Sequence, residues 1–243
     1  MSFRSPGVRW NEVTAVFGGT FDPPHLSHRI AVSGLFSNPG VARVLVVPSP
    51  SPPHKPTTAS AEDRVAMTRL GFAPAMRLPL AGPVEIDLCE IDRARRHPGQ
   101  PTYTYDTLGE LSRRISPLAF VIGTDQLAKL HTWHRFPDVL ALSHWIILER
   151  QTAPGRTLSE AGPVLTQWEA SGLVQKEAGH WRVKLPGGGL GTCLQVVPTP
   201  APAQSSTQIR ESLARQGNPP AESLSSDVLA YLMQRRIYGT GVK

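Results

Sequence analysis

The sequence predicts an α/β fold in which helices cover both faces of a doubly wound, parallel β-sheet. Apolar runs of strand length alternate with segments whose apolar residues recur at helical spacing, and this alternation is typical of parallel sheets. The first apolar run, residues 13–17, passes through Gly18 and Gly19 toward a helical pattern at residues 29–36. In sheets of this kind ligands bind beyond the carboxyl ends of the strands, so the segments after the strands are the candidates for function.

The next elements of the chain keep this alternation. Residues 43–47 form a second apolar run, and the loop over residues 48–58 is rich in proline. Ser60 is a suitable N-cap for a helix that we expect to end near Leu70. Residues 84–88 alternate between apolar and polar side chains, which predicts a strand nearer an edge of the sheet.

The second half of the chain continues the pattern around one interruption. Residues 151–191 hold scattered polar, proline and glycine residues, which predicts an irregular peripheral insertion with some packing through Trp168 and Trp181. We therefore expect one domain over residues 1–243. The remaining predicted elements are a helix over 104–113, a strand over 118–122, short helices over 126–130 and 137–142, strands over 145–148 and 194–197, a helix from about 206, and a helix over 226–236.

Composition places the chain among ordinary globular proteins. It has 243 residues, of which 40% are hydrophobic, so it can bury a substantial core. Cys89 and Cys193 are too few for a disulfide framework, residues 1–7 lack the apolar core of a secretion signal, and no apolar stretch is long enough to cross a bilayer. We therefore expect a cytoplasmic protein with no membrane contact; its oligomeric state stays open, a homo-oligomer included.

A formal net charge of +6 indicates attraction to anions, so nucleic acid has to be considered as a partner. The densest basic run, residues 93–97, has no zinc-finger spacing, RNA-recognition motif or long basic stripe beside it. We interpret this run as a solvated loop. Small phosphorylated substrates explain the charge as well as a polynucleotide would, and we expect no nucleic acid partner.

The most informative segment is residues 18–28, Gly-Gly-Thr-Phe-Asp-Pro-Pro-His-Leu-Ser-His. A strand that passes through glycines into a helix forms a cradle for phosphate, because the backbone approaches the anion closely and the helix offers unpaired N–H groups. His25 and His28 are three residues apart, so a helix would place them on one face near its positive end. They are suited to bind charge that develops on a reacting phosphate. The alternatives are an ordinary turn, surface histidines or metal ligands, although further ligands at metal-site spacing are missing from the sequence.

A second anion site is predicted where the last strand leads into a helix. Ser206 and Thr207 are suitable caps, and the first turn of the helix has unpaired N–H groups. Arg210 lies three residues after Thr207, on the same face, from which its forked donors can reach a phosphate. The alternative is a routine capped helix with a surface arginine.

Taken together, the two motifs resemble those of the nucleotidyltransferase superfamily of adenylyl- and cytidylyltransferases. The first signature of that superfamily reads G-x-F-x-P-x-H-x-G-H, and the second reads I-S-S-T-x-I/V-R. Ser27 stands where the first has glycine, and Gln204 stands where the second has its leading residue. The matching residues of the first signature are Gly19, Phe21, Pro23, His25 and His28.

The middle of the chain narrows the resemblance to bacterial nicotinate mononucleotide adenylyltransferases, which have a Rossmann-like fold. The segments that carry it are residues 52–55, 101–108, 120–125 and 130–136, with Thr102 and Phe136 as departures from the usual serine and tryptophan. These enzymes join ATP to nicotinate mononucleotide and release pyrophosphate, in a step of NAD biosynthesis. The resemblance spans roughly residues 13–148 and 194–238 and leaves the segment between them unmatched.

The resemblance implies a role for each matching residue. Trp133 would stack on the pyridine ring, Thr104 would meet the nicotinate carboxylate through its backbone, and Arg135 would belong to the same mononucleotide site. The residues implied in catalysis are His25, His28, Lys55 and Arg210. Those implied in ATP binding are Gly18, Gly19, Thr20, Phe21, Gly123, Asp125, Ser206 and Thr207. The alternatives are a core position for Trp133, a helix cap for Asp125 and a solvated Lys55.

The implied reaction needs no protein nucleophile, because the 5′-phosphate of the mononucleotide can attack the α-phosphorus of ATP in line. The protein would position the substrates and stabilise the charge that develops. ATP would carry its own Mg²⁺, and we expect no protein metal ligand. The alternative functions are a phosphopantetheine adenylyltransferase, a dual-specificity enzyme that also accepts nicotinamide mononucleotide, and a nucleotide-binding sensor without turnover.

Overall fold

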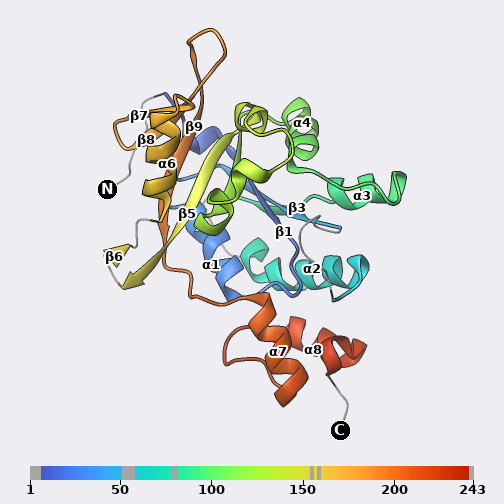
Figure 1. The fold of residues 1–243 in the computed structure, drawn as a ribbon. Helices are drawn as coiled ribbons and strands as arrows, with labels where there is room; N and C mark the ends of the chain where they lie inside the picture. The colour runs from blue at the N-terminus through green and yellow to red at the C-terminus, as the bar shows by residue number, and fades with distance from the viewer. Residues whose placement is uncertain (1–6, 51–57, 78–81, 154–155, 158–159, 241–243) are drawn as a thin grey trace.

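A computed structural model describes residues 7–50, 58–77, 82–153, 156–157 and 160–240 of the chain. It contains one mixed β-sheet with helices on both faces, which confirms the predicted fold class (Figure 1). The strands are β1 (Thr14–Gly19), β2 (Arg43–Pro48), β3 (Val84–Ile86), β4 (Leu118–Gly123), β5 (His144–Ala153), β6 (Arg156–Thr157), β7 (Val174–Glu177), β8 (His180–Lys184) and β9 (Leu190–Thr199).

The helices lie between these strands and after the last one. The α-helices are α1 (Leu26–Leu35), α2 (Ala61–Arg77), α3 (Cys89–Arg96), α4 (Thr104–Arg114), α5 (Thr124–Leu127), α6 (Ala161–Ala170), α7 (Ser206–Gln216) and α8 (Ser226–Arg235). Short 3₁₀ turns are η1 (Trp10–Glu12), η2 (Leu130–Thr132), η3 (Asp138–Leu142) and η4 (Ile237–Gly239).

The strand order is β3-β2-β1-β4-β5-β9-β8-β7. The short strand β6 is not part of this order and pairs antiparallel with β5. The first six strands of the order run parallel, and β1 pairs with β2 on one side and with β4 on the other. The chain winds outward in one direction from β1 to β3 and in the other from β4 to β9. The strand order therefore reverses between β1 and β4, which is where open α/β sheets bind their ligands.

Two hydrophobic cores lie on opposite faces of the sheet. One buries Val32 and Leu35 of α1 and Phe72 of α2 against β1 and β2. The other buries Leu108 and Leu111 of α4 together with side chains of β4, β5, η3 and α6. Because both faces are covered, the central strands are apolar on both sides, which is why they are recognisable in the sequence as continuous apolar runs.

The last part of the chain forms a third, smaller cluster at one end of the sheet. Ile209 and Leu213 of α7 pack with Val228 and Leu232 of α8, and α8 also contacts α2. Figure 1 shows α7 and α8 together at the bottom of the view, beside α2. This packing brings the start of α7 to the carboxyl end of β1.

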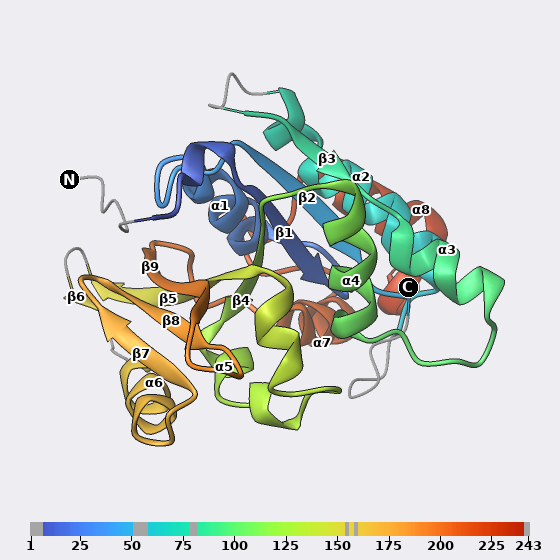
Figure 2. The ribbon, with the colours of Figure 1, turned by 90° about the horizontal axis from the view of Figure 1, so that it is seen from above.

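The insertion at residues 151–191 contains regular secondary structure, whereas the sequence predicts an irregular segment. It contains α6 and the antiparallel hairpin of β7 and β8, and β8 pairs with β9, so the insertion extends the main sheet. Figure 2 shows these elements at the opposite end of the sheet from β3. The predicted packing of Trp168 is confirmed, since its side chain belongs to the same hydrophobic core as Leu108 and Leu111 of α4. The short strands were missed because tertiary pairing, which the sequence does not display, stabilises them.

The basic run at residues 93–97 is also different from its prediction as a solvated loop. Most of it forms the last turn of α3, where arginine favours the negative end of the helix dipole. The preceding strand β3 is shorter than predicted, because Asp87 Oδ1 accepts the backbone N–H of Cys89 at 2.9 Å and helps α3 to begin there. The helix predicted from Ser60 is longer and continues through Pro74 to Arg77.

Candidate functional site

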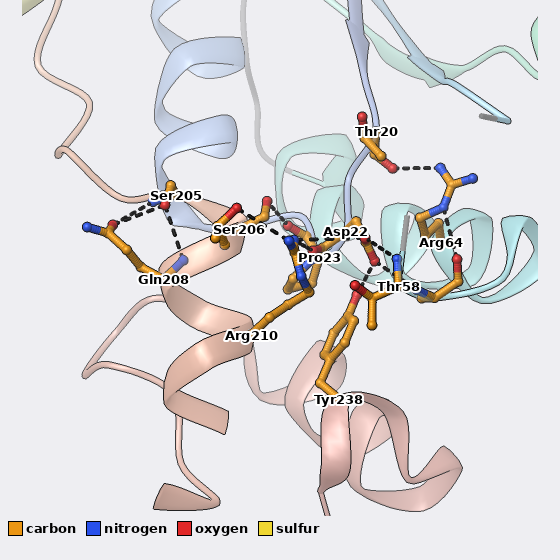
Figure 3. Close-up of polar contacts among 12 residues, drawn as sticks. Thr20, Asp22, Pro23, Thr58, Arg64, Ser205, Ser206, Gln208, Arg210 and Tyr238 are labelled. Carbon is orange, nitrogen blue, oxygen red and sulfur yellow. Dashed lines mark hydrogen bonds and ion pairs between the residues drawn. The ribbon is translucent and has the colours of Figure 1, made fainter. Parts of the chain in front are cut away.

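The two phosphate motifs, far apart in the sequence, meet at the carboxyl end of β1 (Figure 3). Ser206 Oγ donates a hydrogen bond to the carbonyl of Pro23 at 2.9 Å. Arg210 Nη1 donates to the carbonyl of Asp22 at 2.8 Å. The start of α7 is therefore bonded directly to the glycine turn. We call this region, residues 18–28 and 205–210 with the side chains that bond to them, the phosphate end, after the role that the sequence predicts for it.

Gly18 and Gly19 are the last residues of β1, and the turn after them is tightly built. A Cβ added to Gly19 would lie 2.7 Å from the ring of Phe21, so a larger residue would displace that ring. Phe21 has a left-handed backbone with φ of +49° and is 2% exposed. Its ring packs on Phe17 and lies edge-on to His28, with 5.3 Å between ring centroids. The side chain of Phe21 therefore shapes the turn and supports His28.

His25 and His28 lie together, as the sequence predicts, although His25 is the N-cap of α1 and not part of the helix. Their rings stack with centroids 3.7 Å apart. The backbone N–H of His25 donates to Nδ1 of His28 at 3.1 Å. Because Nδ1 accepts this bond, a neutral His28 carries its proton on Nε2, which makes Nε2 the donor of the ring.

The cap of α7 is Ser205, so the prediction that Ser206 and Thr207 cap this helix is wrong. Ser205 Oγ accepts the N–H of Gln208 at 3.2 Å, and Gln208 Oε1 accepts the N–H of Ser205 at 3.2 Å. This reciprocal pair is a capping box. Ser206 instead bonds to the glycine turn, and Thr207 Oγ1 accepts from Arg210 Nη2 at 3.3 Å.

Asp22 is the centre of the phosphate end, and the sequence did not single it out. Its carboxylate is 2% exposed and accepts the backbone N–H groups of Thr58 at 2.8 Å and Ala59 at 3.2 Å. The hydroxyl of Tyr238 donates to Oδ1 at 2.6 Å, and Arg210 Nη1 lies 3.8 Å from Oδ2. A buried carboxylate needs several donors of this kind, because its desolvation is costly.

Arg64 is a second buried residue that the sequence did not single out. It is fully buried, and Nη1 donates to the carbonyl of Thr20 at 2.8 Å. Further bonds from its guanidinium reach the carbonyls of Ser49, Pro50 and Ala59. Arg64 therefore ties the turn after β1 to the turn after β2. Lys55, the predicted cation of the proline-rich loop, lies outside the described residues.

The two departures from the superfamily motifs contact each other. Ser27 Oγ donates to the carbonyl of Pro202 at 2.9 Å and lies 3.4 Å from Oε1 of Gln204. Ser27 is nearly buried at the start of α1. Its hydroxyl therefore joins α1 to the segment that leads into α7.

The residues predicted for the mononucleotide also come together, around the start of α4. Thr104 is the first residue of α4, and its N-cap, Tyr103, makes no side-chain cap bond. The ring of His134 stacks on Tyr103 with centroids 4.2 Å apart, and the Arg135 guanidinium lies 4.6 Å from the centre of the Tyr105 ring. We call this region, residues 103–105 and 133–135, the ring end, after the pyridine ring that it is predicted to bind.

Trp133 packs at the edge of the core. It is half-buried, and its ring packs against Phe120 and Trp145 with centroids 6.3 and 6.4 Å away. The residues that follow it, His134 and Arg135, are exposed. Trp133 therefore packs against the core, as one of the two interpretations expects, and its role toward a ligand stays a prediction.

The segment after β4 holds Gly123 and Asp125, two of the residues implied in ATP binding. Gly123 is the N-cap of α5, and no side chain caps that helix, so the alternative of Asp125 as a cap is wrong. Asp125 is exposed. A Cβ added to Gly123 would lie 2.6 Å from Asp125 Oδ1, so the absent side chain at Gly123 leaves room for this carboxylate.

A cluster of polar side chains joins α4 to α3. Thr107 Oγ1 donates to Glu90 Oε1 at 2.8 Å, and Arg93 Nη1 donates to Thr107 Oγ1 at 3.0 Å. Arg93 also pairs with Glu110 at 2.6 Å. Burial raises the pKa of Glu90 to about 7, although its bond to Thr107 and the charge of Arg93 act against that rise. The cluster fixes α4 against α3.

Two further observations concern only the described part of the chain. None of its helices has both the length and the apolar character that a membrane span requires. No three of its histidine, cysteine, aspartate or glutamate side chains gather closely enough to hold a metal ion.

Comparison with known proteins identifies the family. Residues 16–212 match the cytidylyltransferase-like family. The chain belongs to that family. It is 32% identical over 236 residues, 95% of its length, to a Klebsiella pneumoniae protein named "Probable nicotinate-nucleotide adenylyltransferase", of which the match covers 99%. A Cellvibrio japonicus protein of the same name is 32% identical over 92% of this chain and 97% of the relative. The chain is thus a nucleotidyltransferase, and the resemblance found in the sequence is confirmed.

The fold of this family member also matches that of a solved structure. The structure of nicotinic acid mononucleotide adenylyltransferase from Plasmodium falciparum complexed with NaAD superposes with a TM-score of 0.69 and 15% identity. The match covers 96% of this chain and all of the Plasmodium chain. At that identity the likeness establishes the shared fold.

Proposed function

We propose that this nucleotidyltransferase joins ATP and nicotinate mononucleotide to give nicotinate adenine dinucleotide and pyrophosphate, in a step of NAD biosynthesis. One observation carries the proposal: the stacked pair of His25 and His28 stands at the end of β1 beside the start of α7 and Arg210, at the point where the strand order reverses. The names of the relatives and of the Plasmodium complex, which contains NaAD, support the choice of substrates.

In the proposed reaction the protein supplies positioning and positive charge. The 5′-phosphate of the mononucleotide attacks the α-phosphorus of ATP, the bond to the bridging oxygen breaks, and pyrophosphate leaves with the electron pair. His28 donates from Nε2 to the α-phosphate, and His25 contacts the phosphate beside it. Arg210 and Lys55 neutralise the leaving pyrophosphate.

The remaining residues bind the two substrates. Thr104 offers first-turn N–H groups of α4 to the nicotinate carboxylate, Trp133 stacks on the pyridine ring, and Arg135 lies beside them. Gly123 and Asp125 bind nucleotide ribose. The residues that we assign to the ATP phosphates through their backbone or hydroxyl groups are Gly18, Gly19, Thr20, Phe21, Ser206 and Thr207.

The proposal includes Mg²⁺, which ATP brings as its counterion. Magnesium bound to nucleotides keeps phosphate and water ligands, so the protein need not provide a cage of its own. We place the protein in the cytoplasm, where its two buried free cysteines would stay reduced.

Release of pyrophosphate from ATP tests the proposed function. The protein is incubated with ATP, Mg²⁺ and one of three acceptors: nicotinate mononucleotide, nicotinamide mononucleotide or phosphopantetheine. We expect the highest kcat/KM with nicotinate mononucleotide and formation of the dinucleotide. Release with phosphopantetheine alone would instead identify a phosphopantetheine adenylyltransferase. ATP binding without release with any acceptor would identify a nucleotide sensor.

A further inference from the structure

Arg210, the proposed partner of the leaving pyrophosphate, is held in place on two sides. Its Nη1 donates to the carbonyl of Asp22 at 2.8 Å and lies 3.8 Å from the Asp22 carboxylate. Its Nη2 donates to Thr207 Oγ1 at 3.3 Å. The guanidinium is planar, so two fixed nitrogens determine the direction of the whole group. The position of Arg210 therefore depends on where Asp22 lies.

The position of Asp22 depends in turn on a residue near the end of the described chain. The Tyr238 hydroxyl donates to Asp22 Oδ1 at 2.6 Å, a shorter bond than the one from Ala59 N–H to the same oxygen, at 3.2 Å. Figure 3 shows Tyr238 rising from below toward Asp22, with Arg210 beside it. Burial of the hydroxyl, and to a lesser degree its bond to Asp22, raises the pKa of Tyr238 above its ordinary value. The hydroxyl therefore keeps its proton and remains a donor.

Tyr238 also adopts an unusual backbone conformation. Its φ is +60° within η4, a region that residues other than glycine rarely occupy. Such a conformation persists only where surrounding contacts determine it. Those contacts include burial of the ring in the cluster formed by α2, α7 and α8, and the bond of its hydroxyl to Asp22. The chain turns unfavourably at this point and brings a hydroxyl to the phosphate end.

We propose that Tyr238 is a positioning residue for the transfer reaction, which acts through the Asp22 carboxylate to hold Arg210 in the direction of the leaving pyrophosphate. This inference rests on the proposed function and adds the C-terminal turn η4 to the residues on which turnover depends. Because Tyr238 is buried and its hydroxyl bonds to Asp22, it would act through Asp22 and not by contact with a substrate.

Tyr231 offers a matched control. Its hydroxyl donates to a carboxylate oxygen of Asp63 at 2.8 Å, so it makes the same kind of bond from α8 to α2 without contact to Arg210. Four variants are compared with the wild type: Tyr238→Phe, Tyr231→Phe, Arg210→Lys, and Tyr238→Phe combined with Arg210→Lys. For each, kcat and KM for ATP and nicotinate mononucleotide are measured by pyrophosphate release, and thermal unfolding is recorded.

We expect Tyr238→Phe to lower kcat by about 10- to 100-fold, as misplacement of a positioning group does, and Tyr231→Phe to leave kcat within about twofold. The double variant should be no slower than Arg210→Lys alone, because Tyr238 acts through Arg210. A purely structural Tyr238 would instead give losses that multiply. If Tyr238→Phe does not fold, Asp22→Asn, alone and combined with Arg210→Lys, replaces it in the same comparison.

Three results would overturn the inference. The first is a folded Tyr238→Phe variant with near-normal kcat, and the second is losses that multiply in the double variant. The third is an Arg210→Lys variant with full turnover, because turnover would then not depend on the position of Arg210. These results are distinct from failure of the proposed function, which is a wild-type protein that releases no pyrophosphate with nicotinate mononucleotide.

Discussion

The phosphate end and the ring end of the site are built in different ways. At the phosphate end, the side chains that hold the loops together are buried: Arg64 is 0% exposed, Asp22 2% and Tyr238 8%, and they are joined by hydrogen bonds from distant parts of the chain. At the ring end, His134 and Arg135 are exposed: His134 stacks on Tyr103, and Arg135 lies over Tyr105 and forms an exposed ion pair with Asp138 at 3.1 Å. One end is fixed by a buried polar network, and the other is a surface of aromatic and cationic groups.

This difference matches the two tasks of the proposed reaction. Charge develops on the reacting phosphates, and stabilising it requires donors that are already in place before the reaction. Recognition of a flat ring requires a platform with a donor group at its edge, which stacked side chains provide without a rigid network. Substitutions at the phosphate end should therefore change turnover, and substitutions at the ring end should change binding of one substrate.

The largest effect is expected for His28→Ala. Loss of a donor aimed at developing charge typically lowers the rate by about 100- to 1,000-fold, and His28 lies where the α-phosphate is proposed to sit. The expected loss appears in kcat, with thermal unfolding little changed. His97→Ala, at the exposed C-cap of α3, is the control and should keep normal turnover. A folded His28→Ala variant with nearly normal turnover would show that the assignment is wrong.

Trp133→Ala tests the ring end. Removal of a stacking platform should weaken binding of the mononucleotide by about 1 to 3 kcal/mol, by analogy with base stacking, and leave ATP binding nearly unchanged. Isothermal titration with each substrate measures both. Trp181→Ala is the matched control, because Trp181 is also partly buried against the same core but lies on β8. An equal fall in ATP affinity would mean that Trp133 acts only as a core residue.

A comparison of nicotinate and nicotinamide mononucleotide as substrates tests whether the ring end recognises the carboxylate. The first turn of α4 offers N–H donors at Thr104, and these favour a carboxylate over an amide. An amide would place its own N–H₂ among those donors and leave buried groups unpaired, at about 1 to 3 kcal/mol each. We expect kcat/KM to favour nicotinate over nicotinamide mononucleotide by at least about tenfold. Equal values would identify a dual-specificity enzyme.

The smallest effect is expected for Ser27→Ala, which tests whether α1 and the segment before α7 are joined. The hydroxyl bond to Pro202 should contribute about 0.5 to 1.5 kcal/mol to the free energy of unfolding. Denaturant unfolding measures it. Ser37→Ala, at an exposed position after α1, should change the free energy by less than about 0.5 kcal/mol. Equal stability of the two variants would contradict a linking role for Ser27.

Much of the fold could be predicted because its signals are local. Apolar runs predicted β1, β2, β4 and β5, since strands buried on both faces are apolar throughout. The glycine turn and the two histidines could be found because each depends on residues close in sequence. The insertion could not, because the short strands β7 and β8 depend on pairing with β9.

The functional site shows the same difference between features set by residues close in sequence and features set by distant residues. The sequence by itself determined the chemical groups, His25, His28 and Arg210, and their places at the ends of elements. Only the tertiary structure decided that Asp22 accepts from Tyr238 and that Arg210 bonds to the glycine turn. The physical reason is the separation of the partners along the chain. A buried carboxylate must find donors, but composition and periodicity do not say which distant segment will supply them.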